Sequence, residues 1–302
     1  MTTDERTTAH PGDGPTTPLG AADDVELLDC GDGRRLERFG SVLLDRPAPA
    51  VADLPRRDPA AWRAADARYD RGPGWTGPRP PTGTWRVRLG GVGLTCRLSA
   101  EGGVGCYPEH AALWRAIADE LASRPGARLL NGFGHTGGLT IAAAAAGASV
   151  AHVDAARAAV GTARSNAEAD GLAGAPIRWI VDDVRAFVER EVRRGRRYDL
   201  VVLDPPSYGQ GGGGRAWRLA DDLPRLAASA IQLLEGPDGA LVVTLHSSGW
   251  TEDRLRRLLD DTAPVGTGGR PGGTTATWTT TLAARSGALL PAGIGARWEV
   301  AR

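Results

Sequence analysis

The sequence predicts an α/β protein built on a doubly wound, mostly parallel sheet of seven strands, with a small β-rich region before it. From residue 109 onward, short apolar runs alternate with stretches of helical periodicity, an order typical of parallel strands connected by helices. A glycine-rich loop follows the first of the apolar, strand-like runs, and acidic residues follow the next three. Because parallel strands bring their carboxyl ends to one edge of a sheet, we expect a ligand to bind at that edge.

The part of the chain before this sheet differs in composition. Residues 1–24 are rich in Thr, Pro, Gly and Asp, which predicts a disordered tail. Residues 25–108 are expected to form a small β-rich accessory region, with short strands at 25–28 and 41–44 and a hairpin at 85–98 that turns at Gly90-Gly91. The stretch 45–82 carries many Pro, Arg and Asp residues and predicts an irregular connection with at most one short helix.

Residues 109–302 predict the sheet itself, because strand-like apolar runs and helical periodicity alternate along them. The expected parallel strands are 127–130, 149–153, 177–181, 200–203 and 240–245. The expected helices lie around 112–121 and at 139–146, 155–169, 184–194, 221–234 and 251–259. Two further strands, 274–282 and 296–300, are expected to add an antiparallel hairpin at one edge.

The charge balance and the cysteine content limit the functional classes to which this chain can belong. Lys+Arg and Asp+Glu both number 36, so the formal net charge is zero and any basic surface must be local. The three cysteines, Cys30, Cys96 and Cys106, are widely spaced and predict neither a disulfide framework nor a zinc site. We expect no metal and a reducing, cytoplasmic setting, since the first residues form no apolar signal core and no apolar run is long enough for a membrane span.

The glycine-rich loop, Asn131 to Gly138, joins the first parallel strand to the next helix. Gly132, Gly134 and Gly137 formally satisfy the G-x-G-x-x-G pattern of dinucleotide sites. Asp154, Asp182, Asp183 and Asp204 follow the next three strands. Taken singly, such glycines often pack a helix against a strand, and an acid such as Asp183 can be only a helix cap. As a set they favour ligand binding at one sheet edge.

The segment Leu200 to Gly209 carries the strongest functional signal. Pro205 and Pro206 cannot continue a central strand, so the buried strand ends at Asp204, with the ring of Tyr208 close behind. An acid-lined edge suits a cationic ligand such as S-adenosylmethionine better than the pyrophosphate of a nicotinamide dinucleotide. A nicotinamide enzyme would also leave the Asp-Pro-Pro-Ser-Tyr run unexplained.

These motifs together resemble the class I S-adenosylmethionine-dependent methyltransferases, whose fold is a Rossmann-like sheet. More narrowly, they are similar to the bacterial group that modifies bases of large-subunit (23S) ribosomal RNA, which includes cytosine carbon-5 and guanine nitrogen-7 enzymes. The resemblance extends from about residue 26 to the end of the chain, and rests on the motifs at 130–138, 153–154, 182–184 and 203–209. The segment Gly105 to His110 is similar to the one that closes over the cofactor in that group.

The resemblance implies a role for each matching residue. The implied cofactor-binding residues are Tyr107, Asn131, Gly132, Phe133, Gly134, Thr136, Gly137, Asp154, Asp182, Asp183 and Asp204. Among them the loop residues would hold the methionine part, Asp154 the ribose hydroxyls, and Asp182 or Asp183 the adenine. The implied catalytic residues, which would face the methyl acceptor, are Asp204, Pro205, Pro206 and Tyr208.

The chemistry of the acceptor is expected to be direct transfer to nitrogen. Methylation of cytosine carbon-5 needs a thiolate nucleophile, whereas the segment 244–250 contains no cysteine and Cys106 is better explained as a buried packing residue. The side chain of Asp204 would orient a base amino group, and the ring of Tyr208 would stack on an extruded base. His246 is either a base near the acceptor or a strand-end histidine.

We therefore expect an S-adenosylmethionine-dependent methyltransferase (a one-carbon transferase) that acts on an RNA base, with ribosomal RNA as partner. A small-molecule or protein acceptor, an NAD(P)-dependent oxidoreductase, and a cofactor-binding module without catalysis are the alternatives. The basic cluster at 193–197 is either a solvated helix end or a contact to phosphates. The glycine-rich loop 210–214 is either a lid or an insertion.

Overall fold

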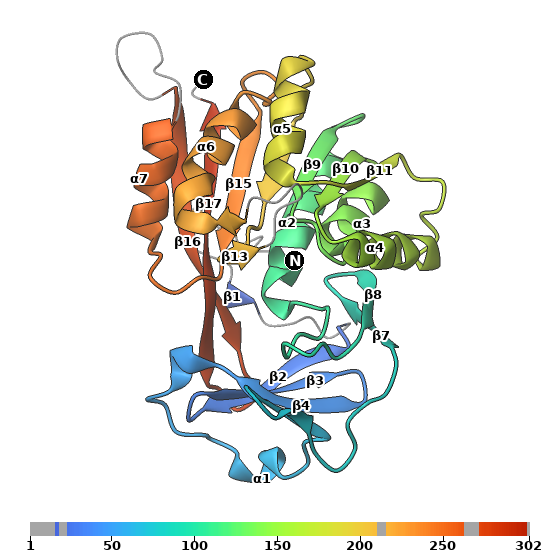
Figure 1. Ribbon diagram of the computed structural model, residues 1–302, viewed down its shortest axis with the longest axis vertical. Coiled ribbons are helices and arrows are strands. Elements are labelled where there is room, and N and C mark those ends of the chain that lie inside the picture. Colours follow the sequence, from blue (N-terminus) through green and yellow to red (C-terminus); the bar gives the residue numbers. More distant parts are fainter. Residues whose placement is uncertain (1–15, 18–22, 210–215, 263–271, 301–302) are drawn as a thin grey trace, which may run out of the picture.

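The computed structural model describes residues 16–17, 23–209, 216–262 and 272–300. Most of the tail expected at 1–24 and the whole loop at 210–214 lie outside these residues. Two residues of the expected tail, Thr16–Thr17, instead form a short strand, β1, that pairs with β16. Figure 1 shows a large sheet with its helices above and a smaller sheet below, joined by long strands that run between them.

The large sheet confirms the predicted doubly wound architecture. Its strands lie in the order β1-β16-β17-β15-β12-β9-β10-β11. The central strands are mutually parallel: β9 (Arg128–Gly132), β10 (Ser149–Asp154), β11 (Ile177–Val181), β12 (Leu200–Leu203) and β15 (Ala240–Leu245). The predicted antiparallel hairpin is formed by β16 (Gly273–Ala283) and β17 (Leu289–Val300), and β17 pairs antiparallel with β15. The two-residue β1 adds to the edge of the seven expected strands.

Helices cover both faces of this sheet, because successive strand residues point to opposite sides. One core contains Leu129 and Val150 with residues of α2 (Ala111–Ala122), α3 (Gly138–Ala145) and α4 (Arg157–Ala169). The other contains Leu130 and Ala151 with residues of α5 (Val184–Arg193), α6 (Leu219–Ile231) and α7 (Glu252–Thr262). None of the helices in the described ranges has the length and apolar character needed to cross a bilayer.

The small sheet contains more strands than the sequence predicts. Its order is β2 (Val25–Gly31), β3 (Arg34–Phe39), β4 (Val42–Pro47), β5 (Ala67–Asp70) and β6 (Gly74–Thr76). The expectation of an irregular connection over 45–82 is wrong at β5 and β6, which flank a tight turn. That stretch also holds a 3-10 turn, η1 (Pro49–Val51), and one short helix, α1 (Pro59–Trp62).

Ion pairs explain why the charged strand β3 is buried. The side chain of Arg46 in β4 bonds the carboxylate of Glu37, with Nη2 2.6 Å and Nε 2.8 Å from Oε2, and both side chains are almost fully buried. In the same sheet, Arg34 pairs with Asp45 and lies 2.8 Å from Asp70. Charged residues such as Glu are depleted in strands. Strand β3 therefore depends on ion-pair partners in neighbouring strands, which the sequence pattern does not reveal.

The predicted hairpin at 85–98 is confirmed as β7 (Trp85–Leu89) and β8 (Val92–Cys96), which turn at Gly90 and Gly91 with positive φ. It packs on the large sheet's helices: Asn166 Oδ1 in α4 accepts hydrogen bonds from the N–H and hydroxyl groups of Thr95. Beyond it the chain enters a second 3-10 turn, η2 (Pro108–His110), directly before α2. This segment therefore approaches the large sheet from the side of the small one.

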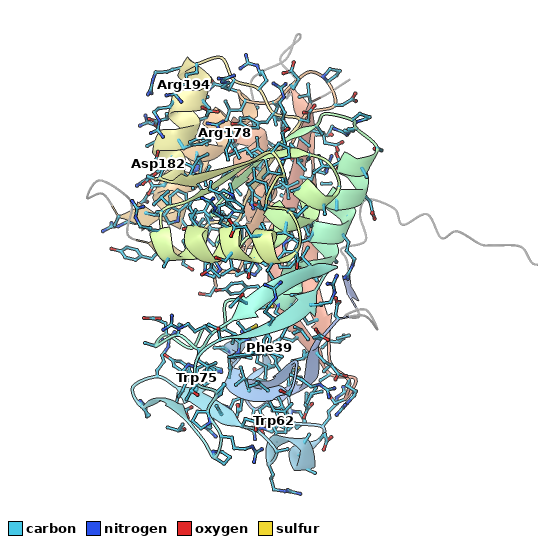
Figure 2. The ribbon with its side chains drawn as sticks, turned by 90° about the vertical axis from the view of Figure 1, so that its right-hand side faces the viewer. Phe39, Trp62, Trp75, Arg178, Asp182 and Arg194 are labelled. Atoms are coloured by element: carbon cyan, nitrogen blue, oxygen red, sulfur yellow. The ribbon has the colours of Figure 1, made fainter. Side chains whose placement is uncertain are left out.

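The β16–β17 hairpin joins the two sheets. Its far end packs Leu282 and Leu290 against Leu27 of β2 and Val51 of η1. The N–H of Arg285 also donates to the carbonyl of Leu27 at 2.9 Å. Figure 2 shows the same arrangement from the side, with Phe39, Trp62 and Trp75 in the lower part of the molecule, far from Arg178 and Arg194 in the upper part.

The buried pair of β3 and β4 leads to a stability prediction. Arg46→Ala leaves Glu37, whose side chain is 1% exposed, with Arg35 at 3.3 Å as its remaining ion-pair partner among the described residues. We expect the free energy of unfolding in urea to fall by about 3 kcal/mol, because a buried carboxylate loses its main partner. The control is Arg164→Ala, which removes an exposed pair with Glu168 on α4 and should cost less than about 0.5 kcal/mol. Equal losses in the two variants would contradict this account.

Candidate functional site

A cavity of about 870 Å³ opens at the carboxyl ends of β9, β10, β11, β12 and β15. This is the edge at which the sequence predicts a ligand. Its volume is within the range of small-molecule and cofactor sites. The described residues that line it are Tyr107, Glu109, His110, Phe133, His135, Asp154, Ala155, Ala156, Asp183, Val184, Asp204, Pro205, Pro206, Ser207, Gly209, Trp217, His246 and Ser247.

Seven of the residues predicted for the site line the cavity: Tyr107, Phe133, Asp154, Asp183, Asp204, Pro205 and Pro206. Among those that do not, Asn131 is buried and donates from Nδ2 to Thr140 Oγ1 at 2.9 Å. Thr136 donates its hydroxyl to the carbonyl of Gly105 at 2.8 Å, which ties the loop to the segment before η2. The side chain of Asp182 forms an ion pair with Arg190.

Tyr208 is not among the residues that line the cavity, although its neighbours Ser207 and Gly209 are. It belongs to a two-residue strand, β13 (Tyr208–Gly209), which pairs with β14 (Trp217–Arg218), and it is 63% exposed. Trp217, from the paired strand β14, does line the cavity. The Trp217 ring lies 5.0 Å from the ring of Phe133, and Trp217 Nε1 donates to the carbonyl of Pro206 at 2.7 Å. The structure thus brings Trp217, not Tyr208, into the wall beside the two prolines.

The glycines of the loop serve internal packing. A side chain at Gly134 would meet the ring of His152 at 2.5 Å, and one at Gly132 would meet Leu203 at 2.7 Å. The loop residues that line the cavity are Phe133 and His135, both with positive φ. Positive φ is uncommon outside glycine and is found where surrounding structure enforces it, often at functional sites. The predicted glycine pattern therefore marks the right loop, although Gly132, Gly134 and Gly137 do not line the cavity themselves.

The acids at the ends of β10 and β11 are held by the backbone. Asp154 accepts from the N–H of His135 at 2.9 Å and from that of Ala156 at 2.8 Å. Asp183 is the N-cap of α5, accepting from the N–H of Arg185 at 2.8 Å, and it also pairs with the Arg185 side chain. Asp183 is thus a cap that also lines the cavity, so the two interpretations of this acid are compatible.

Asp204 lies between two imidazole rings. Its Oδ2 is 3.2 Å from His110 Nε2, its Oδ1 is 3.3 Å from His246 Nε2, and Oδ1 also accepts the hydroxyl of Thr244 at 2.7 Å. His246 Nδ1 lies 2.6 Å from the carbonyl oxygen of Ala292, and the two rings pack edge to face at 4.7 Å. Three segments, η2, the end of β12 and the end of β15, meet here.

The contact between Asp204 and the two imidazoles shifts the pKa values of Asp204 and His246. Burial disfavours the charge on Asp204, but His110 and His246 outweigh it and hold the pKa of that carboxyl well below its usual range. Burial likewise disfavours protonation of His246, but the hydrogen bond and charge of Asp204, with Glu109 and the carbonyl of Ala292, raise its pKa to about 9. At neutral pH His246 is a cation that donates from both nitrogens. In this protonated form His246 Nε2 holds no free lone pair with which to act as a base, whereas loss of that proton exposes the Nε2 lone pair.

Two residues that sequence reasoning did not single out present unpartnered atoms at this edge. Glu109 Oε2 and His135 Nδ1 are buried and have no hydrogen-bond partner within the described residues. Burial opposes the charge of Glu109, yet Arg35, His110 and His246 keep its pKa below the usual value. Buried polar atoms are rarely left unpaired, so both are available to a ligand. Only the Gly105 to His110 motif pointed toward Glu109 and His110.

No thiol lines the cavity. Cys30, Cys96 and Cys106 are all buried, and the pKa of Cys106 is raised well above its ordinary value by its contact with Cys96 and by burial. The thiolate that covalent catalysis requires is therefore disfavoured.

The basic cluster lies at the opposite edge of the sheet. Arg196 and Arg197 line a hollow with Arg128 and Arg178, at the amino-terminal ends of the strands. Some of this charge is paired, since Arg178 and Arg194 each lie 3.4 Å from Glu191. The cluster does not contribute to the cavity.

Comparison with known proteins identifies relatives of the chain. A family model described as S-adenosylmethionine-dependent methyltransferase matches residues 61–265. The crystal structure of an S-adenosylmethionine-dependent methyltransferase from Agrobacterium tumefaciens is 32% identical, covers 95% of this chain and 96% of its own, and superposes with a TM-score of 0.85. A Streptococcus mutans methyltransferase structure is 16% identical, with coverages of 93% and 76% and a TM-score of 0.72, which shows the shared fold.

Among curated relatives, ribosomal RNA large subunit methyltransferase I of Klebsiella pneumoniae is 32% identical over 142 residues. The match covers 45% of this chain and 34% of that protein, so the chain spans about a third of the relative's length. The same protein from Escherichia coli matches equally well, at 32% over 143 residues.

The pKa of His246 gives a pH prediction. Because the folded state raises this pKa from its ordinary 6.5 to about 9, the proton stabilises the fold fully below about pH 6.5, and this contribution is lost as pH rises through about 9. In buffer free of divalent metal ions, NMR titration of the imidazole signals should show one ring that stays charged through neutral pH. His135, whose pKa is lowered by burial, serves as the internal contrast. A His246 ring that titrates at its ordinary pKa would contradict the Asp204 contact.

Proposed function

This chain belongs to the S-adenosylmethionine-dependent methyltransferase family, and we propose that it methylates a nucleobase of ribosomal RNA by direct transfer to nitrogen. Two observations support the proposal. The Asp-Pro-Pro segment lies in the cavity wall beside the loop that follows β9, and curated relatives are named ribosomal RNA large subunit methyltransferases. The oxidoreductase alternative does not fit this family.

The residues of the cavity fit the cofactor. S-adenosylmethionine carries an ammonium and a sulfonium but no phosphate. The described lining includes four acids, Glu109, Asp154, Asp183 and Asp204, and contains neither Arg nor Lys. The buried and unpartnered Oε2 of Glu109 is an additional acceptor for a cationic ligand. A pyrophosphate would meet four carboxylates here and no arginine or lysine among the described lining residues.

We assign the cofactor contacts to residues that line the cavity. Asp154 would accept the ribose hydroxyls, since its carboxylate is aimed by two backbone N–H groups and retains further acceptor positions. Asp183 would face the adenine, and Tyr107 and Phe133 would flank the methionine part. For Asn131, Gly132, Gly134, Thr136 and Gly137 we propose an indirect role, in which they shape the loop that carries Phe133 and His135. Asp182 is paired with Arg190 and is the weaker candidate for adenine.

The bound cofactor supplies a methyl group that is already activated on a positively charged sulfur. The remaining work is positioning the acceptor and excluding water. Asp204 has three partners in Thr244, His110 and His246, so its Oδ2 keeps one acceptor position for a base amino group. Pro205 and Pro206 stiffen the wall that the acceptor meets. For stacking, Trp217 is better placed than the exposed Tyr208.

A small-molecule acceptor is the second candidate, and specific observations favour it. The Arg196 and Arg197 cluster lies at the sheet edge opposite the cavity, and the formal net charge is zero. The chain also covers only about a third of the curated RNA methyltransferases it matches. We propose that residues 25–108 act as an accessory region beside the methyltransferase domain at 109–302, with the small sheet available for acceptor contacts.

The catalytic role proposed for Asp204 can be tested by substitution. Asp204→Ala should lower kcat/KM by at least about 100-fold, because it removes the charge and acceptor that orient the methyl acceptor. The unfolding midpoint should report a folded protein. Asp253→Ala, which removes an acid that is 72% exposed on α7, is the matched control and should keep full activity. A fully active Asp204→Ala variant would end the catalytic assignment.

The class of methyl acceptor, and the atom that receives the methyl group, can be tested with labelled cofactor. Tritium from methyl-labelled S-adenosylmethionine should enter total RNA and not a protein or metabolite extract; the reverse pattern favours the small-molecule candidate. With 5-fluorocytosine RNA we expect no stable covalent complex, because the buried thiol of Cys106 is disfavoured as a thiolate. A trapped complex that disappears in Cys106→Ala would overturn direct transfer.

A further inference from the structure

We propose that His110, Asp204 and His246 form a binding site for one divalent transition-metal ion of the zinc type, set in the wall of the cavity. The three residues come from η2, from the end of β12 and from the end of β15. Each offers one ligand atom, and these atoms all lie within 4.8 Å of one another. The proposal rests on this juxtaposition and holds whichever acceptor the enzyme uses.

Two nitrogen–oxygen distances have the length found in a coordination shell, one at each oxygen of Asp204. Oδ2 lies 3.2 Å from His110 Nε2, and Oδ1 lies 3.3 Å from His246 Nε2. In a tetrahedral site with bonds of about 2.0 Å, neighbouring ligand atoms are separated by about 3.3 Å. Two imidazoles and one carboxylate are also a donor set that zinc and iron(II) favour, whereas calcium and magnesium prefer oxygen ligands alone.

The surroundings orient the donors as in known metal sites. His246 Nδ1 lies 2.6 Å from the carbonyl of Ala292, so Nδ1 carries a proton and the other ring nitrogen, Nε2, faces Asp204. Two electron-rich atoms in that position require a positive charge between them, supplied by a proton or by a metal ion. The hydroxyl of Thr244 fixes Asp204 Oδ1 at 2.7 Å. Outer hydrogen bonds of this kind, from imidazole to carbonyl and from hydroxyl to carboxylate, are typical of metal ligands.

The cavity supplies room for a fourth ligand. His110, Asp204 and His246 all line it, as does the carboxylate of Glu109. Catalytic zinc sites keep three protein ligands and leave one position to water or substrate. Asp204 and Glu109 together carry two negative charges, which balance a divalent cation. The geometry thus points to an ion whose open position faces the methyl acceptor.

Cobalt(II) provides the probe, because its visible absorption reports tetrahedral coordination. The full chain, stripped with a chelator and dialysed, should take up one equivalent of Co²⁺ with visible bands that one equivalent of Zn²⁺ abolishes. His110→Ala and His246→Ala should each weaken binding at least about 10-fold. His135→Ala, which removes another histidine of the same cavity that is not part of the cluster, should bind as the wild type does.

A second measurement avoids dependence on the variants' folding. In the wild type, Zn²⁺ should shift the imidazole NMR signals of two of the five histidines, those of His110 and His246. The proposal is overturned if no stoichiometric uptake occurs, or if folded His110→Ala and His246→Ala variants bind as well as the wild type. Calorimetry with S-adenosylmethionine in the presence of chelator distinguishes failure of the metal site from failure of the proposed methyltransferase function. If the chain binds the cofactor there but takes up no Co²⁺ or Zn²⁺ without chelator, the metal site alone is overturned.

Discussion

The charge of Asp204 at the end of the buried strand β12 is the constraint on which the site depends. A carboxylate at this depth is tolerated because two imidazoles and the hydroxyl of Thr244 surround it. His110 lies in η2, directly before α2, and His246 is held by the carbonyl of Ala292 in β17. One charge therefore links the end of β12 to a segment that precedes the central sheet and to one that follows it in the chain.

Much of the fold follows from the sequence because the central strands contain short apolar runs. Leu200–Leu203 and Ala240–Leu245 are buried at every position, and such runs are recognisable without knowledge of their neighbours. Strand β3 does not follow from the sequence for the opposite reason, since Arg34 and Glu37 are buried in ion pairs with residues of other strands. The role expected for Tyr208 stays a prediction: its strand pairs with β14, its side chain is exposed, and Trp217 of β14 lines the cavity. This arrangement depends on the pairing of two strands of two residues each, which are too short to show a periodicity in the sequence.

The loop after β9 shows how a motif can mark a site without forming its surface. Its glycines are required where His152, Leu203 and Ala163 approach the backbone closely. The cavity instead receives Phe133 and His135, whose left-handed conformations are held by the neighbouring hydrogen bond between His135 N–H and Asp154. Strain of this kind persists only where the surroundings enforce it. The glycines of the G-x-G-x-x-G pattern thus mark the close packing of the loop, and two residues between them, Phe133 and His135, line the cavity.

Ala292 is shared by two parts of the molecule. Its carbonyl holds the ring of His246, while its side chain packs against the cluster that joins Leu27, Val51 and Leu290. Recombination between relatives would therefore not exchange the amino-terminal sheet as an independent module. A chimera that takes the small sheet from a relative but keeps the native β16–β17 hairpin would misplace the imidazole of His246 at the edge of the large sheet. The segments to exchange together are therefore the small sheet and the tip of the hairpin.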